Sequence, residues 1–247
     1  MESSQLVFMM LLFTVAFLYS SVGHGGASGY LALMGLFHFA PEVMKPAALI
    51  MNLVVSLMAF MQYFRTNPLN KKLFLLLIAG SVPAAFLGAR IEIDAFVYKK
   101  ILAVILIIPV LRLLGFFGNK NPEQKIFRPL SAVIIGIVIG FVSGMIGIGG
   151  GIILSPVILF LGWADMKQTA TISALFIFLN SASGLLGLVT KGVVISPSIY
   201  LWVAIAVAGG ISGSWLGSKK FENNLLKKIL GVVLLIASVK LLTEKNG

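Results

Sequence analysis

The sequence predicts an all-helical (all-α) integral membrane protein, built from two inverted repeats of about five helical segments each, with short helices broken by glycine. Three observations predict this class. Hydrophobic residues make up 59% of the chain and charged residues 11%, against about 25% charged residues in a typical soluble domain. Long apolar runs follow one another from end to end. Segments of the second half repeat segments of the first half at a nearly constant spacing.

The apolar runs come first, because a helix needs about 20 apolar residues to cross the hydrocarbon core of a bilayer. A soluble chain of 247 residues could not bury all of them. The first run starts beside Glu2 with no Lys or Arg, so we interpret it as a lasting structural element rather than a signal peptide. The eight long runs are 5–22, 46–64, 73–89, 97–117, 130–146, 169–190, 197–216 and 225–243.

The repeat is visible in three sets of matched residues. Nine of the sixteen positions in 99–114 are identical to their partners in 227–242. The other two matches are Gly80 and Gly88 with Gly209 and Gly217, and Gly23-His24-Gly25-Gly26 with Gly147-Ile148-Gly149-Gly150-Gly151. We therefore expect a first transmembrane repeat over 1–117, a cytoplasmic linker over 118–128, and a second repeat over 129–247.

Two further apolar stretches, 28–39 and 152–162, are too short to span a bilayer alone, and each directly follows a glycine cluster. With the run before it, each forms either a re-entrant hairpin or two full crossings. Both alternatives return the chain to the side where it started. Each copy then has an odd number of net crossings, so the two copies are expected to have opposite orientations.

The basic residues agree with this inversion. Loops 64–72 and 218–228 and the linker are rich in Lys and Arg, which the positive-inside rule assigns to the cytoplasm, whereas loop 191–196 has only Lys191. Both termini are then non-cytoplasmic. The net charge of +11 is expected to serve topology rather than nucleic-acid binding or substrate attraction. The absence of cysteine excludes disulfides and thiolate metal sites.

The glycine clusters are the candidate site. A helix break inside a membrane is tolerated only where it is buried in protein or lines a polar cavity. The next half-helix then begins with free N–H groups and a positive dipole end, which together suit an anion. Close helix packing is the alternative role for these glycines. The substrate-binding candidates at the breaks are Gly23, His24, Gly25, Gly26, Ser28, Gly147, Gly149, Gly150 and Gly151.

Polar residues inside the spans add neutral donors to this site. Asn52 and Asn180 correspond between the copies, and Thr171 and Ser173 precede Asn180. Asn amides and hydroxyls can donate to an oxyanion without burying a charge. Hydrogen bonding between helices is the alternative role. His24 could carry a proton coupled to anion movement, since the ordinary pKa of histidine is near 6.5, or it could simply hydrogen-bond within its turn.

Several function classes are disfavoured by what the sequence lacks. No carboxylate falls in the middle of a span, which argues against a cation exchanger. No metal-binding motif, lipase-type serine motif or nucleotide phosphate loop is present. We therefore expect no cofactor, no metal and no enzymatic activity. Duplicated hydrophobic segments that are each interrupted by glycine are typical of secondary transporters.

The second glycine cluster, followed by Pro156, by 167–173 and by 213–217, resembles the TauE/SafE family of membrane proteins, the sulfite exporter or DUF81 family. The first cluster, with 41–49 and 80–88, is similar to the first half of the same family. The resemblance covers almost the whole chain. It implies transport of a small sulfur-containing oxyanion, of the sulfite, organosulfonate or thiosulfate class, across the plasma membrane of a prokaryote.

Two other classes stay open on the residues alone. An anion channel would need a continuous polar path to both surfaces. A structural subunit of a membrane complex would need no cavity at the glycine breaks. The expected partners are the lipid bilayer and the anion, with no nucleic acid, and the chain could form a homodimer.

Overall fold

The computed structural model of the protein describes residues 3–21, 25–65, 69–113, 125–217 and 224–243. Within these ranges the chain forms ten α-helices and no strand, which confirms the predicted all-helical class. The first five helices are α1 (Ser3–Ser21), α2 (Ala27–Leu36), α3 (Pro41–Phe64), α4 (Lys71–Ala89) and α5 (Ala95–Leu113). The others are α6 (Pro129–Ile146), α7 (Gly151–Leu161), α8 (Met166–Val189), α9 (Ser198–Gly217) and α10 (Asn224–Thr243).

Local sequence signals account for the helix ends. Proline occupies the first position of α3 and of α6, where its missing N–H costs nothing. Asn70 caps α4 by accepting from the Leu73 amide at 3.1 Å. Asp165 caps α8 by accepting from the Gln168 amide at 2.8 Å. These caps fix where the long helices begin.

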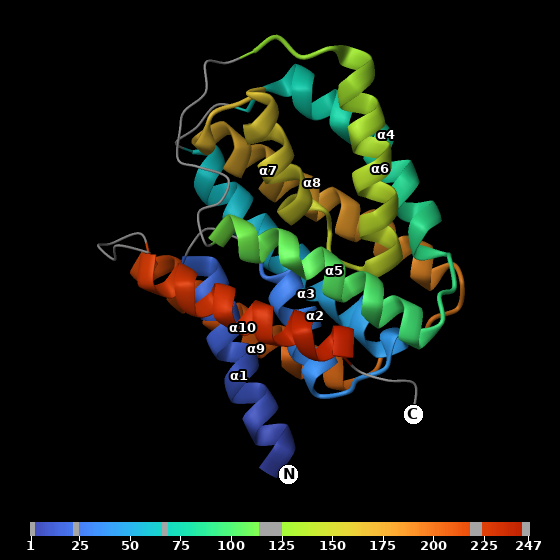
Figure 1. The fold of residues 1–247 in the computed structure, drawn as a ribbon, viewed down its shortest axis with the longest axis vertical. Coiled ribbons are helices and arrows are strands. Elements are labelled where there is room, and N and C mark those ends of the chain that lie inside the picture. Colours follow the sequence, from blue (N-terminus) through green and yellow to red (C-terminus); the bar gives the residue numbers. More distant parts are fainter. Residues whose placement is uncertain (1–2, 22–24, 66–68, 114–124, 218–223, 244–247) are drawn as a thin grey trace.

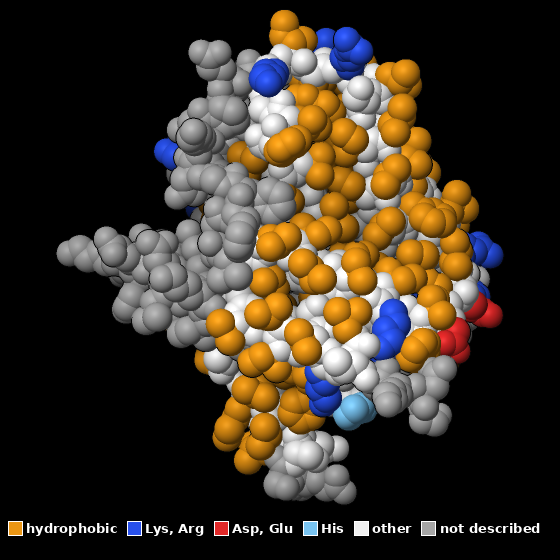
Figure 2. All heavy atoms as spheres, viewed as in Figure 1, with side chains coloured by type: hydrophobic (Ala, Val, Ile, Leu, Met, Phe, Trp, Pro, Cys, Tyr) orange, Lys and Arg blue, Asp and Glu red, His pale blue; other side chains and the backbone are white. Residues whose placement is uncertain are grey.

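The surface is that of a membrane protein. Within the part of the chain that the structure describes, four helical stretches are long and apolar enough to cross a bilayer by length and composition: Pro41–Phe64, Lys71–Ala89, Pro129–Ile146 and Lys167–Val189. Large side chains such as Leu75, Leu87 and Phe160 are exposed. Figure 2 shows hydrophobic side chains over most of the described part of one face, with basic side chains gathered at the top and near the lower edge. Lipid is the solvent that such a surface requires.

The two halves interlock rather than forming separate cores. Helix α4 packs along α6, and its counterpart α9 packs along α1 (Figure 1). Glycines make the first contact close: a methyl group at Gly140 or Gly144 would strike the carbonyl oxygen of Ser81 or Ala85 on α4. Gly213 of α9 is pressed against Phe17 of α1 in the same way. For these glycines, close packing is the role that the structure shows.

Equivalent helices of the two halves run antiparallel where they meet. The Ser238 hydroxyl of α10 donates to the Ala103 carbonyl of α5 at 2.7 Å, and Lys100 of α5 donates to the Leu241 carbonyl of α10 at 3.2 Å. On α3 and α8, which also pack together, Leu49 lies beside Gly184. An inverted duplication would produce such pairs. The inversion relative to the membrane, and the domain boundaries, stay predictions.

The loops after α4 and α8 meet at one end of the molecule. Lys191, after α8, forms an ion pair with Glu92 at 2.6 Å and donates to the Arg90 carbonyl, both of which follow α4. The start of α1 joins them, because Phe8 packs on Phe39 and on the α9 residue Trp202. The side of the membrane that this end faces stays a prediction. Residues 114–124 of the linker region lie outside the described residues.

Candidate functional site

The second glycine cluster is a tight turn between α6 and α7. Gly147 ends α6 with a φ of 89°, and its amide donates to the Ser143 carbonyl at 2.7 Å. Gly149 and Gly150 also have positive φ, of 71° and 79°, which an L side chain rarely adopts. Helix α7 then begins at Gly151 with no side-chain cap. The glycines are therefore required by the turn, and they leave the first amides of α7 without a side-chain partner.

The first cluster has the same form where the structure describes it. Gly26 has a φ of 84° and precedes α2, which also lacks a side-chain cap. The hydroxyl groups of Ser28, in the first turn of α2, and Tyr19, near the end of α1, lie 2.6 Å apart in a hydrogen bond. The predicted residues Gly23 and His24 lie outside the described residues, so the role of His24 stays a prediction.

The two clusters meet at Asn52 of α3 and Ile177 of α8. A methyl group at Gly25 would lie 3.5 Å from Oδ1 of Asn52 and 3.5 Å from Cδ1 of Ile177. One at Gly149 would lie 2.8 Å from Nδ2 of Asn52 and 3.0 Å from Cγ2 of Ile177. Asn52 also donates to the Ile148 carbonyl at 3.2 Å. Two uncapped helix starts thus lie on either side of one buried amide.

Three buried hydroxyl groups that have no hydrogen-bond partner among the described residues lie against these glycines. The Tyr30 oxygen lies 2.7 Å from where a methyl group on Gly26 would be, and the Ser143 oxygen lies 2.6 Å from the equivalent point on Gly150. The Ser181 oxygen lies 2.7 Å from that point on Gly149. A buried hydroxyl without a partner is uncommon and costs about 1–3 kcal/mol. Each is a donor that a bound anion could use.

Sequence reasoning missed Tyr30 and Ser143, and it noted Ser181 only as one of several hydroxyl residues around Asn180 that could line the path. The signal was present in the spacing, because Tyr30 follows Gly26 by four residues and Ser143 precedes Gly147 by four. Residues four apart lie on one face of a helix. Both side chains therefore come from the helical turn that adjoins the break.

The remaining candidates lie farther from the breaks or have their donors occupied. Asn180 donates from Nδ2 to the Ser81 hydroxyl at 3.0 Å and to the Phe176 carbonyl at 2.9 Å, so both N–H groups of its amide are used. The Thr171 hydroxyl donates to the Lys167 carbonyl. The Ser173 hydroxyl bonds with that of Ser155 at 2.8 Å. Their roles in binding stay predictions.

The space between the clusters is small in this conformation. A cavity of about 20 Å³ is bounded by residues that include Tyr19, Gly26, Ser28, Asn52 and Ile177. A single water molecule needs about 10–15 Å³ measured in this way. The cavity therefore has room for one water but not for a four-atom oxyanion. Within the described residues no group of three or more metal-ligating side chains is present.

Comparisons with known proteins agree on one family. The family model described as Sulfite exporter TauE/SafE matches residues 8–241. The protein named "Probable membrane transporter protein y4hK" of Sinorhizobium fredii is 34% identical over 98% of this chain and all of its own length. No solved structure matches.

Two more distant relatives carry related names. "Probable membrane transporter protein YjnA" of Bacillus subtilis is 25% identical over 96% of this chain and 98% of its own length. "Sulfite exporter TauE/SafE family protein 1" of Arabidopsis thaliana is 27% identical over 51% of this chain and 30% of its own length. The match to the family model and to the Sinorhizobium protein covers almost the entire chain.

Proposed function

The chain belongs to the TauE/SafE family of membrane transporters, and on this premise we propose that it carries a small sulfur-containing anion, of the sulfite, organosulfonate or thiosulfate class, by alternating access. The anion binds between the two glycine clusters. The proposed location is the plasma membrane of a prokaryote, with both termini on the non-cytoplasmic side. The chain needs no cofactor for this role and catalyses no reaction.

The observation that supports this proposal is the convergence of two uncapped helix starts on Asn52. Each helix start presents unpaired N–H groups and a partial positive charge of about half a unit. Glycine allows an anion to approach these amides closely. The buried hydroxyls of Tyr30, Ser143 and Ser181 add donors that now have no acceptor. An oxyanion would provide acceptors for all of these groups.

The donors at the breaks are neutral, which suits transport as well as binding. Partial charges hold an anion without the strong pairing of a buried ammonium or guanidinium group. A transported substrate must also leave, so moderate affinity is an advantage. The glycine breaks themselves contain no Lys or Arg. This donor set suits a monovalent or weakly divalent oxyanion.

The size of the site supports alternating access. A cavity of about 20 Å³ cannot hold sulfite, so the helix starts must separate when the anion enters. Movement of one repeat relative to the other around a fixed site is the usual mechanism of transporters with inverted repeats. The antiparallel contacts of α5 with α10 and of α3 with α8 are compatible with such a movement.

Two measurements distinguish a transporter from a channel or a structural subunit: the dependence of flux on anion concentration, and the effect of the same anion inside the liposomes. Purified protein in liposomes is tested with labelled sulfite, thiosulfate, sulfate, taurine and sulfoacetate. A transporter gives saturable flux for one or more sulfur anions and accelerated exchange when the same anion is present inside. Flux that rises linearly with concentration would indicate a channel. Absence of flux for every anion, in protein that is folded and inserted, would favour a structural subunit.

A further inference from the structure

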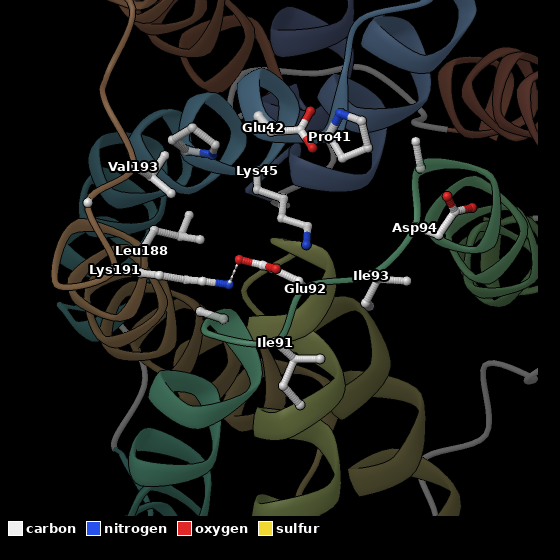
Figure 3. Close-up of a pocket in the computed structure, with 14 residues that line it drawn as sticks. Pro41, Glu42, Lys45, Ile91, Glu92, Ile93, Asp94, Leu188, Lys191 and Val193 are labelled. Carbon is white, nitrogen blue, oxygen red and sulfur yellow. Dashed lines mark ion pairs between the residues drawn. The ribbon is translucent and has the colours of Figure 1, made fainter.

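A cavity of about 510 Å³ lies at the end of the molecule where the loops after α4 and α8 meet the start of α3. Figure 3 shows Lys45 reaching into it from α3, with Glu92 and Lys191 on the opposite wall. We propose that this cavity is an anion-binding vestibule, in which Lys45 holds a small oxyanion before it moves to the glycine clusters. The inference extends the proposed function by adding a second site to the same path.

Lys45 is a buried lysine that forms no ion pair among the described residues. The residue is 7% exposed, and its ammonium nitrogen lies 4.9 Å from the centre of the Tyr98 ring. Among the described residues, the structure gives this nitrogen no hydrogen bond and no ion pair. Burying an ammonium group is expensive unless an opposite charge accompanies it. The aromatic contact offsets only part of that cost, so an anion in the cavity would stabilise Lys45.

The acidic residues that line the cavity form no ion pair with Lys45 among the described residues. Glu92 pairs with Lys191 at 2.6 Å. Asp94 accepts from the amides of Phe96 and Val97 at the start of α5. Glu42, one helical turn before Lys45 on α3, attracts the Lys45 ammonium group electrostatically but forms no ion pair with it among the described residues, and in Figure 3 its carboxylate lies beside Pro41. A formal count gives three acids and two bases in the cavity wall, and of the two bases Lys45 is the one that forms no ion pair among the described residues.

The position of Lys45 connects the cavity to the glycine clusters. A methyl group at Gly147 would lie 3.2 Å from Cα of Lys45. The Tyr98 hydroxyl, on the ring beneath the ammonium group, donates to the Ile146 carbonyl at the end of α6. On α3 itself, Asn52 follows Lys45 by seven residues, which is two helical turns or about 10 Å. The vestibule therefore lies close to the glycine clusters, and the packing between Lys45 and Gly147 has to loosen for an anion to pass from one site to the other.

Solvent reaches the cavity. The side chain of Glu92 is 86% exposed and that of Lys191 is 27% exposed. Lys45 lies behind this pair, so an anion that enters from the loops meets the Lys45 ammonium after it has passed the neutralised Glu92. This order favours anions over cations at the inner end of the cavity.

The natural absence of cysteine makes the vestibule testable without any transport measurement. A single cysteine is introduced at Val193, which lines the cavity. Its labelling rate is measured with a negatively charged and a positively charged methanethiosulfonate of similar size. Neutralising Lys45 in a Lys45→Met variant should lower the ratio of anionic to cationic labelling at least about fivefold, as expected for the loss of one nearby unit charge.

Two variants control this experiment. Lys45→Arg keeps the charge and should keep the ratio within about twofold of the parent, since the Coulomb energy is similar. Lys72→Met removes an exposed lysine from the start of α4 and should leave the ratio unchanged. Sulfoacetate should slow anionic labelling in the parent but not in Lys45→Met, provided that each variant elutes as a monodisperse species from size exclusion.

The outcomes are distinct. An unchanged ratio in Lys45→Met would overturn the proposal and leave Lys45 as a structural partner of Tyr98. A Val193→Cys protein that neither reagent labels would also overturn it, because the cavity would then be closed to solvent. If the ratio falls as expected while no sulfur anion is transported in liposomes, the vestibule stands and the proposed transport function fails.

Discussion

Removing the hydroxyl of Tyr30 should stabilise the protein and weaken anion binding at the same time. Tyr30 is fully buried and its hydroxyl has no hydrogen-bond partner in the described structure. Such a group costs about 1–3 kcal/mol, and an isosteric apolar replacement recovers part of that cost. We therefore expect Tyr30→Phe to raise the free energy of unfolding by about 1 kcal/mol. A substitution that only removed packing contacts would lower the free energy of unfolding instead of raising it.

The effect on binding should be opposite and larger. A hydrogen bond to a charged group contributes about 1.5–3 kcal/mol. If the Tyr30 hydroxyl donates to the anion beside Gly26, its loss should raise the dissociation constant roughly 10- to 150-fold, at 1.4 kcal/mol for each factor of ten. The assay is thermal unfolding in detergent, followed by tryptophan fluorescence, with increasing concentrations of sulfite or sulfoacetate. The unliganded midpoint reports stability, and the rise of the midpoint with anion reports affinity.

Tyr19 provides the matched control. It is also a buried tyrosine, but its hydroxyl bonds with the Ser28 hydroxyl at 2.6 Å. Tyr19→Phe removes one partner of a made bond and should lower the free energy of unfolding by about 1–2 kcal/mol. The reasoning is refuted if Tyr30→Phe destabilises the protein as much as Tyr19→Phe does. It is also refuted if Tyr30→Phe binds the anion with parental affinity.

Three further predictions concern helix packing, the buried amides and the ion pair of Glu92. Gly140→Leu should prevent the close contact of α6 with α4 and lower the unfolding temperature by more than about 5 °C, whereas Gly184→Ala, where only side chains are near, should change it little. Asn52→Ala should lower anion affinity more than Asn180→Ala, because the Asn180 amide donors are already used; equal losses in a binding titration would contradict this. The hydrogen bond from Lys191 and its positive charge hold the pKa of Glu92 below the ordinary value of 4.5. The stabilisation of the folded protein by this ion pair is therefore complete above pH 4.5 and is lost as the pH falls through the lowered pKa. The difference in unfolding temperature between the parent and Glu92→Gln should disappear at that low pH.

Much of the architecture could be predicted because a membrane helix is recognisable from the apolar run of its own residues. Every apolar run that the sequence showed became a helix within the described residues, and the short stretches after the glycine clusters became α2 and α7. The breaks could be predicted because only glycine adopts positive φ without strain. Gly26, Gly149 and Gly150 have this conformation.

The partners of each glycine could not be predicted, because helix packing decides them. Gly140 and Gly150 are both glycines in apolar segments, yet one is pressed against the α4 backbone and the other faces the Ser143 hydroxyl. The same limit applies to Asn52 and Asn180. They correspond in sequence, but Asn52 lies between the glycine clusters while Asn180 bonds to α4 and to its own helix. A repeat in sequence does not require an equal role in both copies.

The proposed role of Lys45 differs from what the sequence predicts about charge, and the prediction stays untested. The glycine breaks contain no basic residue, so the sequence indicated that all basic residues serve topology. The structure brings a lysine from the second turn of α3 against Gly147, with the ammonium group in a separate cavity. A full positive charge at the entrance would raise the local concentration of anions. Neutral donors at the centre would bind the anion more weakly and allow it to leave. In this proposal, Lys45 attracts the anion and the neutral donors at the glycine clusters allow it to leave. The side chain of Lys45 points toward the start of α3 and away from Asn52, so the two sites stay separate.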